Sequence, residues 1–175
     1  MSIINSYRRI DASIRFLIAF FFWLLVLFGL FYWGKYWSYS PLGEYLDSSI
    51  RALIMPILDS LLKNPIINYD IIINPKYRVV ITPECNGLIP YLMILAAIIA
   101  YSCQIARKIF WGLFAFIIFF VMNIIRLYIV VKIVNIYGTK YFYLVHDIGG
   151  NILLIATGAI IFMIYIKGCY ADKEN

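Results

Sequence analysis

Cys85 lies in a stretch of the sequence where a thiol, a proline, a glycine and a carboxylate occur together. This stretch, Thr82–Leu88, leads into the uncharged run 88–106, which predicts that Cys85 lies at the start of a membrane helix. Unpaired backbone N–H groups and the helix dipole favour a thiolate there, the form of cysteine that attacks carbonyl carbons. Thr82 or Asn86 could cap this helix, and either start leaves Cys85 within one turn of it.

Arg126 and His146 are the other residues whose types and positions suit such chemistry. Arg126 interrupts the apolar run 109–131, where an arginine costs roughly 2.5–3.5 kcal/mol on insertion scales and usually faces a polar cavity. His146 precedes the apolar run 148–166 and can exchange a proton near neutral pH. The three types together suit acyl transfer from a peptide, because the thiolate forms a thioester, the imidazole moves the proton and the guanidinium stabilises the oxyanion.

Asn123 and Asp147 are candidate supporting residues for this site. Asn123 precedes Arg126 by three residues and therefore shares its helix face. Asp147 could orient the neighbouring imidazole, but its position just before an apolar run favours a helix-capping role.

Each candidate also has a plainer interpretation. Arg126 could extend to lipid phosphates, His146 could lie at the interface without a task, and Cys85 could be an inert, small apolar residue. Convergence of the three would weaken each of these interpretations. Cys103 and Cys169 fall at the inner face, with no histidine or arginine nearby in the predicted topology, so we expect them to be structural or, at most, lipid-modified. Three cysteines at these spacings with a single histidine match no metal site, and we expect neither metal nor cofactor.

The composition is that of a membrane protein. Of the 175 residues, 64% are hydrophobic and only 14% are charged, whereas soluble domains are nearer a quarter charged. The net charge of +6 does not indicate a nucleic-acid partner, because the basic residues form no single patch with interleaved aromatics. The sequence predicts one all-α integral membrane domain over residues 1–175, surrounded by membrane lipid.

About four apolar runs are long enough to cross the ~30 Å hydrocarbon core as helices. They cover residues 16–33, 88–106, 109–131 and 148–166. Arg107 and Lys108 are predicted to close the second run, and residues 132–147, which are rich in tyrosine, to form a short loop before the fourth. The first is too long for a signal-peptide core and precedes no small-residue cleavage site, so we interpret it as a retained anchor. Aromatic residues at its far end are typical of a membrane interface: Trp33, Tyr36, Trp37 and Tyr39.

The external segment, residues 34–87, carries two further elements. Apolar residues recur at helical spacing over 42–63, which predicts an amphipathic helix along the membrane surface, bent near Pro56. Residues 69–73 and 77–81 are strand-like and predict a small β-hairpin that leads to Cys85. The polar face of the helix is expected to carry Glu44, Asp47, Ser48, Arg51 and Asp59.

The distribution of lysine and arginine predicts an N-in/C-in orientation. Cys85, Arg126 and His146 then fall at the outer membrane boundary, at one depth, and are predicted to share a pocket open to the exterior. The short inner segments would hold the densest basic residues, which are Arg8, Arg9, Arg15, Arg107, Lys108, Lys167 and Lys173.

These residues resemble the three motifs of the exosortases and archaeosortases. The segments are Glu84-Cys85-Asn86-Gly87-Leu88, Asn123-Ile124-Ile125-Arg126 and His146-Asp147-Ile148-Gly149-Gly150, in the family's order and each attached to an apolar span. The resemblance covers residues 80–166 and implies a multi-pass protein of the cytoplasmic (inner) membrane with its active site on the external or periplasmic face. It also implies that Cys85 is the nucleophile, Arg126 the transition-state stabiliser and His146 the acid/base, with Glu84 and Gly87 in support.

The resemblance implies a substrate class as well. Family members are believed to process exported proteins whose C-terminal signal consists of a short motif, a hydrophobic helix and a basic tail. Transfer of the cleaved protein to a lipid- or glycan-linked surface acceptor is expected by analogy with sortases. Many members are longer and have more spans, so this chain resembles a compact form. We hypothesise that the hairpin edge binds the substrate motif by strand addition.

Two other functions remain open from the sequence. A non-catalytic multi-pass subunit, of a transporter or an assembly system, would use Arg126 for a lipid or a partner helix. In that case Cys85 would react no faster with thiol reagents than Cys103. A membrane phosphatase or lipid-transfer enzyme is disfavoured by the wide sequence gap between Arg126 and His146.

Overall fold

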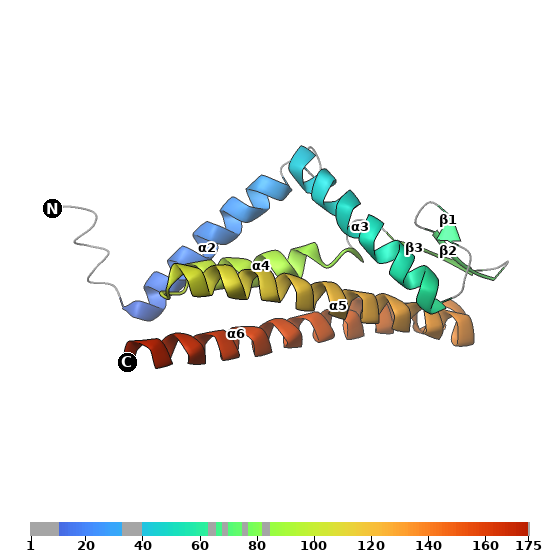
Figure 1. Cartoon of the computed structure of the whole chain (residues 1–175). Helices are drawn as coiled ribbons and strands as arrows, with labels where there is room; N and C mark the ends of the chain where they lie inside the picture. The colour runs from blue at the N-terminus through green and yellow to red at the C-terminus, as the bar shows by residue number, and fades with distance from the viewer. Residues whose placement is uncertain are drawn as a thin grey trace.

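The computed structural model describes residues 11–32, 40–62, 66–67, 70–74, 77–81 and 85–174. Four helices form a bundle, namely α2 (Ala12–Phe31), α4 (Leu88–Ala100), α5 (Ile105–Tyr137) and α6 (Gly150–Glu174). α4 packs against α2, α5 and α6, and α5 also packs against α6. Figure 1 shows that α2 begins, α4 ends, α5 begins and α6 ends at the same end of the bundle. We call this end, which holds Cys103 and Cys169, the disulfide end, and the opposite end, which holds Cys85, the site end.

Among the residues that the structure describes, three stretches of helix are long and apolar enough to cross a membrane, by length and composition. They are Ala12–Phe31, Ile105–Tyr141 and Leu144–Tyr170. The predicted second span, 88–106, is shorter than expected, because α4 ends at Ala100 after 13 residues. At ~1.5 Å per residue α4 rises about 20 Å, less than the ~30 Å core. The count of four spans and the N-in/C-in orientation therefore remain predictions.

The break after α4 has a physical cause in its contacts. Tyr101 is extended, and the chain re-enters a helix at Ile105. Arg107 and Lys108 were predicted to close the second span, but they lie in the first turn of α5. There the Arg107 guanidinium donates to the Gly168 carbonyl of α6, and Lys108 Nζ donates to the Ile99 carbonyl of α4 at 2.6 Å. Ile99 lies in the last turn of α4, so Lys108 binds a carbonyl that this helix end leaves unpaired, and Arg107 connects the start of α5 to α6.

Residues 132–147, predicted to form a loop, are mostly helical. α5 continues to Tyr137 and ends at Gly138, whose φ of +66° suits glycine. A short 3-10 turn (Gly138–Tyr141) follows, and a π-helical segment (Leu144–Gly149) leads into α6. The C-terminal tail is also helical, through Glu174. The sequence placed a loop here because lysine and tyrosine interrupt the apolar pattern, but both residue types are compatible with helix.

A helix is present at the predicted place as α3 (Pro41–Leu62). Its position along the outer membrane surface stays a prediction, and its predicted faces are partly wrong. Ser40 caps it by accepting from the Gly43 N–H at 3.0 Å. Its inner stripe packs into the same core cluster as residues of α2 and α5, and Pro56 is exposed. Asp47, expected on the polar face, is only 1% exposed. The buried apolar residues of the stripe are Ile50, Ile54, Leu58 and Leu62.

The predicted hairpin is confirmed and has one extra strand. β2 (Asp70–Asn74) pairs antiparallel with β3 (Tyr77–Val80), with Ile71 opposite Val79, and the short β1 (Ile66–Ile67) pairs with the other edge of β2. Both β2 and β3 contact α5. Ile71 and Val79 are buried in the core cluster that also contains Cys85. The aromatic belt predicted at Trp33–Tyr39 and the residues Thr82–Glu84 lie outside the described part of the chain.

Candidate active site

Cys85 lies in a short loop that immediately precedes α4. Its side chain is 6% exposed. The Asn86 amide oxygen accepts from the Leu88 N–H at 2.7 Å, so Asn86 satisfies one of the unpaired donors at the helix start. Of the two starts that the sequence allowed, the one at Asn86 is supported because α4 begins at Leu88, and Thr82 lies outside the described residues. Pro90 then lies in the first turn, where its missing N–H costs no hydrogen bond.

Gly87 and Asn123 fix the path of this loop against α5. Gly87 has a φ of +77°, and a Cβ there would lie 3.2 Å from Asn123 Cβ. Asn123 is fully buried and donates from Nδ2 to the Cys85 carbonyl at 2.8 Å. A side chain at position 87 would therefore be strained by its backbone angle and would press on the residue that holds Cys85. The sequence expected both residues to support the site, and the structure places both against the cysteine loop.

His146 reaches Cys85 from the π-helical segment that joins α5 to α6. Its Nε2 lies 3.2 Å from Cys85 Sγ, and its ring stacks on Phe142 at 5.0 Å between centroids. Nδ1 lies 2.8 Å from Asp147 Oδ1. Because a carboxylate only accepts hydrogen bonds, Nδ1 carries a proton and Nε2 of the neutral ring presents its lone pair to the thiol. π-Helical segments often occur at functional sites. In this one, the imidazole of His146 contacts the carboxylate of the next residue, Asp147.

Asp147 corrects a sequence-based preference. The sequence favoured it as a helix cap, whereas its carboxylate contacts the imidazole of His146. It is 45% exposed and His146 is 17% exposed, so the pair lies at the rim of the site. Solvent screening at such a position weakens the electrostatic contribution of the carboxylate.

Arg126 completes the cluster from α5, one helical turn after Asn123. Its guanidinium Nη2 donates to the His146 carbonyl at 3.2 Å and lies 3.4 Å from His146 Nε2. The residue is 6% exposed, and its Nε has no hydrogen-bond partner among the described residues. A Cβ at Gly150 would overlap the Arg126 side chain, so the glycine leaves the space that the arginine occupies. The cluster thus contains a thiol, an imidazole and a guanidinium with spare donors.

Comparison with known proteins shows the family of the chain. Residues 11–163 match the model of a family described as Transmembrane exosortase (Exosortase_EpsH). The chain belongs to this family. A probable archaeosortase E from Methanocaldococcus jannaschii is 31% identical over 156 residues, which cover 89% of this chain and 79% of that protein. No solved structure matches the chain.

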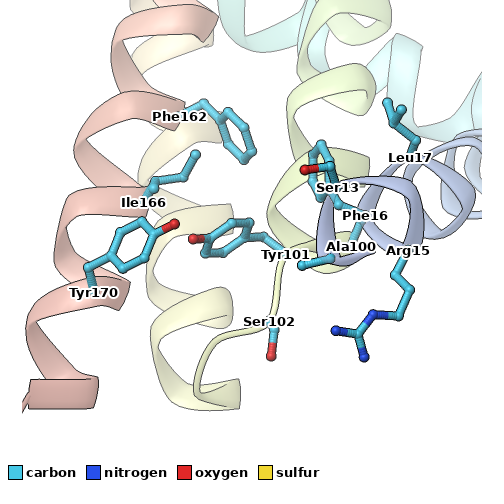
Figure 2. A pocket seen from close by; sticks show the side chains of 11 residues that line it. Ser13, Arg15, Phe16, Leu17, Ala100, Tyr101, Ser102, Phe162, Ile166 and Tyr170 are labelled. Carbon is cyan, nitrogen blue, oxygen red and sulfur yellow. The ribbon is translucent and has the colours of Figure 1, made fainter. Parts of the chain in front are cut away.

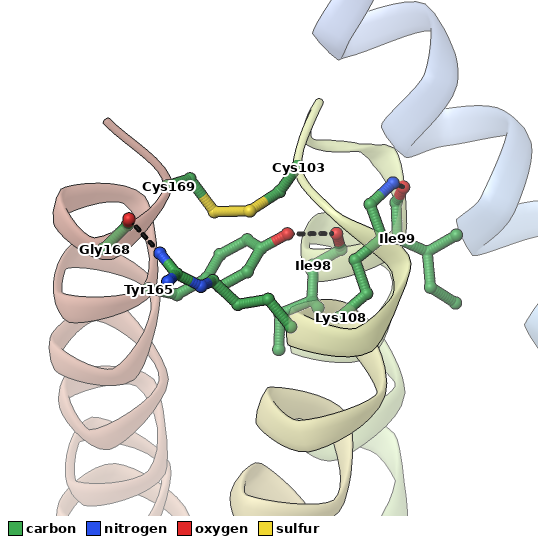
Figure 3. Close-up of a disulfide and its surroundings, with 8 residues drawn as sticks. Ile98, Ile99, Cys103, Lys108, Tyr165, Gly168 and Cys169 are labelled. Atoms are coloured by element: carbon green, nitrogen blue, oxygen red, sulfur yellow. Dashed lines mark hydrogen bonds between the residues drawn. A yellow bond between two sulfur atoms is a disulfide. The ribbon is translucent and has the colours of Figure 1, made fainter. Parts of the chain in front are cut away.

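The other two cysteines of this exosortase-family protein are joined to each other. Cys103 and Cys169 form a disulfide with a Cα–Cα distance of 5.6 Å, shown in Figure 3. The structural role expected for them is confirmed, and the alternative of lipid modification does not fit a bonded pair. Beside the disulfide, Tyr165 donates its hydroxyl hydrogen to the Ile98 carbonyl at 3.0 Å. Cys85 is consequently the free thiol of this exosortase-family protein.

One polar contact of the cysteine loop was missed by the sequence analysis. Asn86 Nδ2 donates to Asp47 Oδ1 at 2.6 Å, which connects α3 to the loop. A signal for it exists, because Asp47 falls on the same helical stripe as Ile50 and Ile54, at spacings of three and seven. A carboxylate within an apolar stripe indicates a buried partner. Glu84, the remaining expected supporting residue, lies outside the described residues.

Proposed function

We propose that this exosortase-family protein is a membrane-embedded cysteine peptidase that cleaves the C-terminal sorting signal of exported proteins through a thioester. The family supports a role in processing sorting signals. The observation that carries the catalytic proposal is the 3.2 Å contact between Cys85 Sγ and His146 Nε2, with Arg126 Nη2 3.4 Å from the same nitrogen. A thiol, a base and a buried cation within one cluster are the groups that acyl transfer requires.

In the first half-reaction, His146 Nε2 accepts the Cys85 thiol proton as Sγ attacks the substrate carbonyl carbon. The carbonyl π electrons move to oxygen, and the Arg126 guanidinium stabilises the resulting oxyanion. Collapse of this tetrahedral intermediate breaks the C–N bond, and the imidazolium returns its proton to the leaving amine. The exported protein is then held as a thioester on Cys85, and the hydrophobic helix with its basic tail is released.

In the second half-reaction, a nucleophile attacks the thioester and regenerates the thiol. We propose that this nucleophile belongs to a lipid- or glycan-linked acceptor at the outer or periplasmic face of the cytoplasmic membrane. His146 takes the proton of the attacking group and delivers it to the departing thiolate. Water in the same position gives hydrolysis, so the peptidase and transpeptidase reactions differ only in the attacking group.

The sheet is the proposed binding place for the substrate's extended motif. β3 is an edge strand, with β2 on one side, and Arg78 and Val80 are exposed on it. The chain runs from β3 through Ile81 towards Cys85, so a peptide paired with β3 would lie close to the thiol. Edge pairing supplies backbone hydrogen bonds without dependence on side chains. Deletion of residues 69–81 should abolish processing while Cys85 remains reactive, and unchanged processing would contradict this assignment.

The test of the catalytic proposal is co-expression with a substrate carrying a C-terminal motif, hydrophobic helix and basic tail. Wild type should release the tail fragment, whereas Cys85→Ala, Arg126→Ala and His146→Ala should not, at equal protein levels in the membrane. A hydroxylamine-sensitive adduct between wild-type enzyme and substrate would identify the thioester. Normal cleavage by Cys85→Ala would overturn the proposal and favour a non-catalytic membrane subunit.

A further inference from the structure

Asp47 is a buried carboxylate on α3, an element to which the proposed reaction assigns no role. It is 1% exposed, and each of its two oxygens has a separate partner. Oδ2 pairs with Arg51 Nη2 at 2.5 Å, and Oδ1 accepts from Asn86 Nδ2 at 2.6 Å. A buried charge is tolerated only when it is well paired, so this arrangement constrains all three side chains.

Asn86 transmits this constraint to the cysteine loop. It is 4% exposed and directly follows Cys85 in the chain. One end of its amide donates to Asp47, and the other end accepts from the Leu88 N–H at 2.7 Å. On the other side of Cys85, the buried Asn123 of α5 donates to the Cys85 carbonyl at 2.8 Å. The loop is therefore held from α3 and from α5 at once.

We propose that Asp47 is a positioning residue that holds Cys85 against His146 through Asn86, an inference that rests on the proposed function for its catalytic consequence. Without the carboxylate, the Asn86 amide loses its acceptor and the loop has one fewer constraint. Cys85 and His146 lie on different segments of the chain, so the distance between Sγ and Nε2 depends on how each segment is held. Small displacements of reacting groups cause large losses of rate. α3 thus acts on the reaction without touching the substrate.

The test measures alkylation of Cys85 by iodoacetamide in the purified, detergent-solubilised full chain. Cys103 and Cys169 are bonded to each other, so alkylation reports on the single free thiol. Asp47→Ala should lower the alkylation rate and the kcat of substrate cleavage on the order of tenfold, with KM unchanged. Asp47→Asn retains an oxygen that accepts from Asn86 and should restore most of both rates.

Two further variants separate positioning from stability. Arg51→Ala removes the ion pair but leaves the acceptor for Asn86, so it should lower the melting temperature without lowering the alkylation rate more than about twofold. Asp59→Ala removes an exposed carboxylate from the same helix and should change neither quantity. A folded Asp47→Ala protein with a wild-type alkylation rate would overturn the inference. So would an equal loss of rate in Arg51→Ala and Asp47→Ala.

The alkylation measurement also distinguishes this inference from the proposed function. It requires no substrate, so a positioned, reactive Cys85 can be detected even in a protein that cleaves nothing. Failure of Cys85→Ala to abolish cleavage would remove the proposed function while the alkylation comparison stands. A lowered kcat with an unchanged alkylation rate in Asp47→Ala would instead refute positioning of the thiol.

Discussion

The two ends of the helix bundle hold similar residue types in very different arrangements. At the site end a free cysteine, an arginine and a histidine contact one another, and Arg126 retains an unpaired donor. At the disulfide end the two cysteines are bonded, and Arg107 donates to the Gly168 carbonyl. A cysteine near an arginine is therefore not sufficient for a site. The difference lies in the histidine, because His146 is the single histidine of the sequence and lies at the site end.

The large cavity and the reactive side chains lie at opposite ends of the bundle. A cavity of about 690 Å³ lies at the disulfide end, between α2, α6 and the α4–α5 connection. Figure 2 shows its lining, which includes Arg15, Phe16, Tyr101, Phe162 and Tyr170. No thiol and no imidazole line it. The proposed site is instead tightly packed, with its cysteine 6% exposed, so its chemistry is identified by contacts between side chains and not by empty volume.

The comparison predicts the largest effect at Cys85. Cys85→Ser should lower the rate of cleavage by roughly a thousandfold or more, because a serine hydroxyl is a far weaker nucleophile beside the same imidazole. The measurement is the rate of tail-fragment release with purified enzyme and substrate. Equal losses in Cys85→Ser and in the double variant Cys103→Ser/Cys169→Ser would show that the two ends do not differ in the way described.

The next largest effect is expected from Gly150→Ala. The added methyl group overlaps the Arg126 side chain and should displace its guanidinium from His146, lowering kcat on the order of a hundredfold. Gly149→Ala is the matched control, because a Cβ there lies 3.4 Å from its nearest contact, the Leu144 carbonyl oxygen, which is ordinary van der Waals contact. Steady-state kinetics of both variants measure the difference. Similar kcat values for the two alanine variants would contradict the assigned role of Arg126.

A smaller effect is expected from the carboxylate that orients His146. Asp147→Ala should lower kcat about tenfold, since the ring loses the acceptor at Nδ1 but the half-exposed carboxylate contributes little charge stabilisation. Asp147→Asn keeps an acceptor oxygen and should lose less. Rates for the three proteins at one pH, with equal substrate saturation, give the comparison. An alanine variant as active as wild type would place Asp147 outside the site.

The smallest effect on activity is expected at the disulfide end. Cys103→Ser/Cys169→Ser should leave the cleavage rate unchanged and reduce the free energy of unfolding by about 2–4 kcal/mol. Thermal unfolding monitored by circular dichroism, with and without reductant, measures the loss. Reductant should lower the melting temperature of wild type but not of the double variant. A cleavage rate that falls with the disulfide would show that the two ends are coupled.

Several features could be predicted from the sequence because they depend on local pattern. Helical periodicity located α3, and alternation with a turn located the β2–β3 hairpin. Successive apolar helices run in alternating directions, so α4 and α6 run the same way. The residues just before α4 and just before α6 must therefore lie at the same end of the bundle. That geometry is why Cys85 and His146 could be expected together, with Arg126 brought to the same level by its distance along α5.

Other features could not be predicted, because hydropathy does not distinguish a side chain facing lipid from one packed against protein. The early end of α4 coincides with contacts between distant residues, namely the hydrogen bond from Lys108 to the Ile99 carbonyl and the neighbouring disulfide. The burial of Asp47 depends on Asn86, a residue distant in sequence. The helical continuation through 132–147 depends on packing of these residues against their neighbours, which single-sequence patterns do not contain.

The sequence by itself determined that this is a membrane protein, and it predicted that a cysteine, an arginine and a histidine lie at one depth. The reason is that composition and helix rise are properties of the chain alone. Only the tertiary structure decided which cysteines are bonded to each other, which arginine contacts the histidine and which carboxylate contacts the imidazole. Those outcomes are set by distances between side chains on different elements, and such distances exist only once the helices have packed.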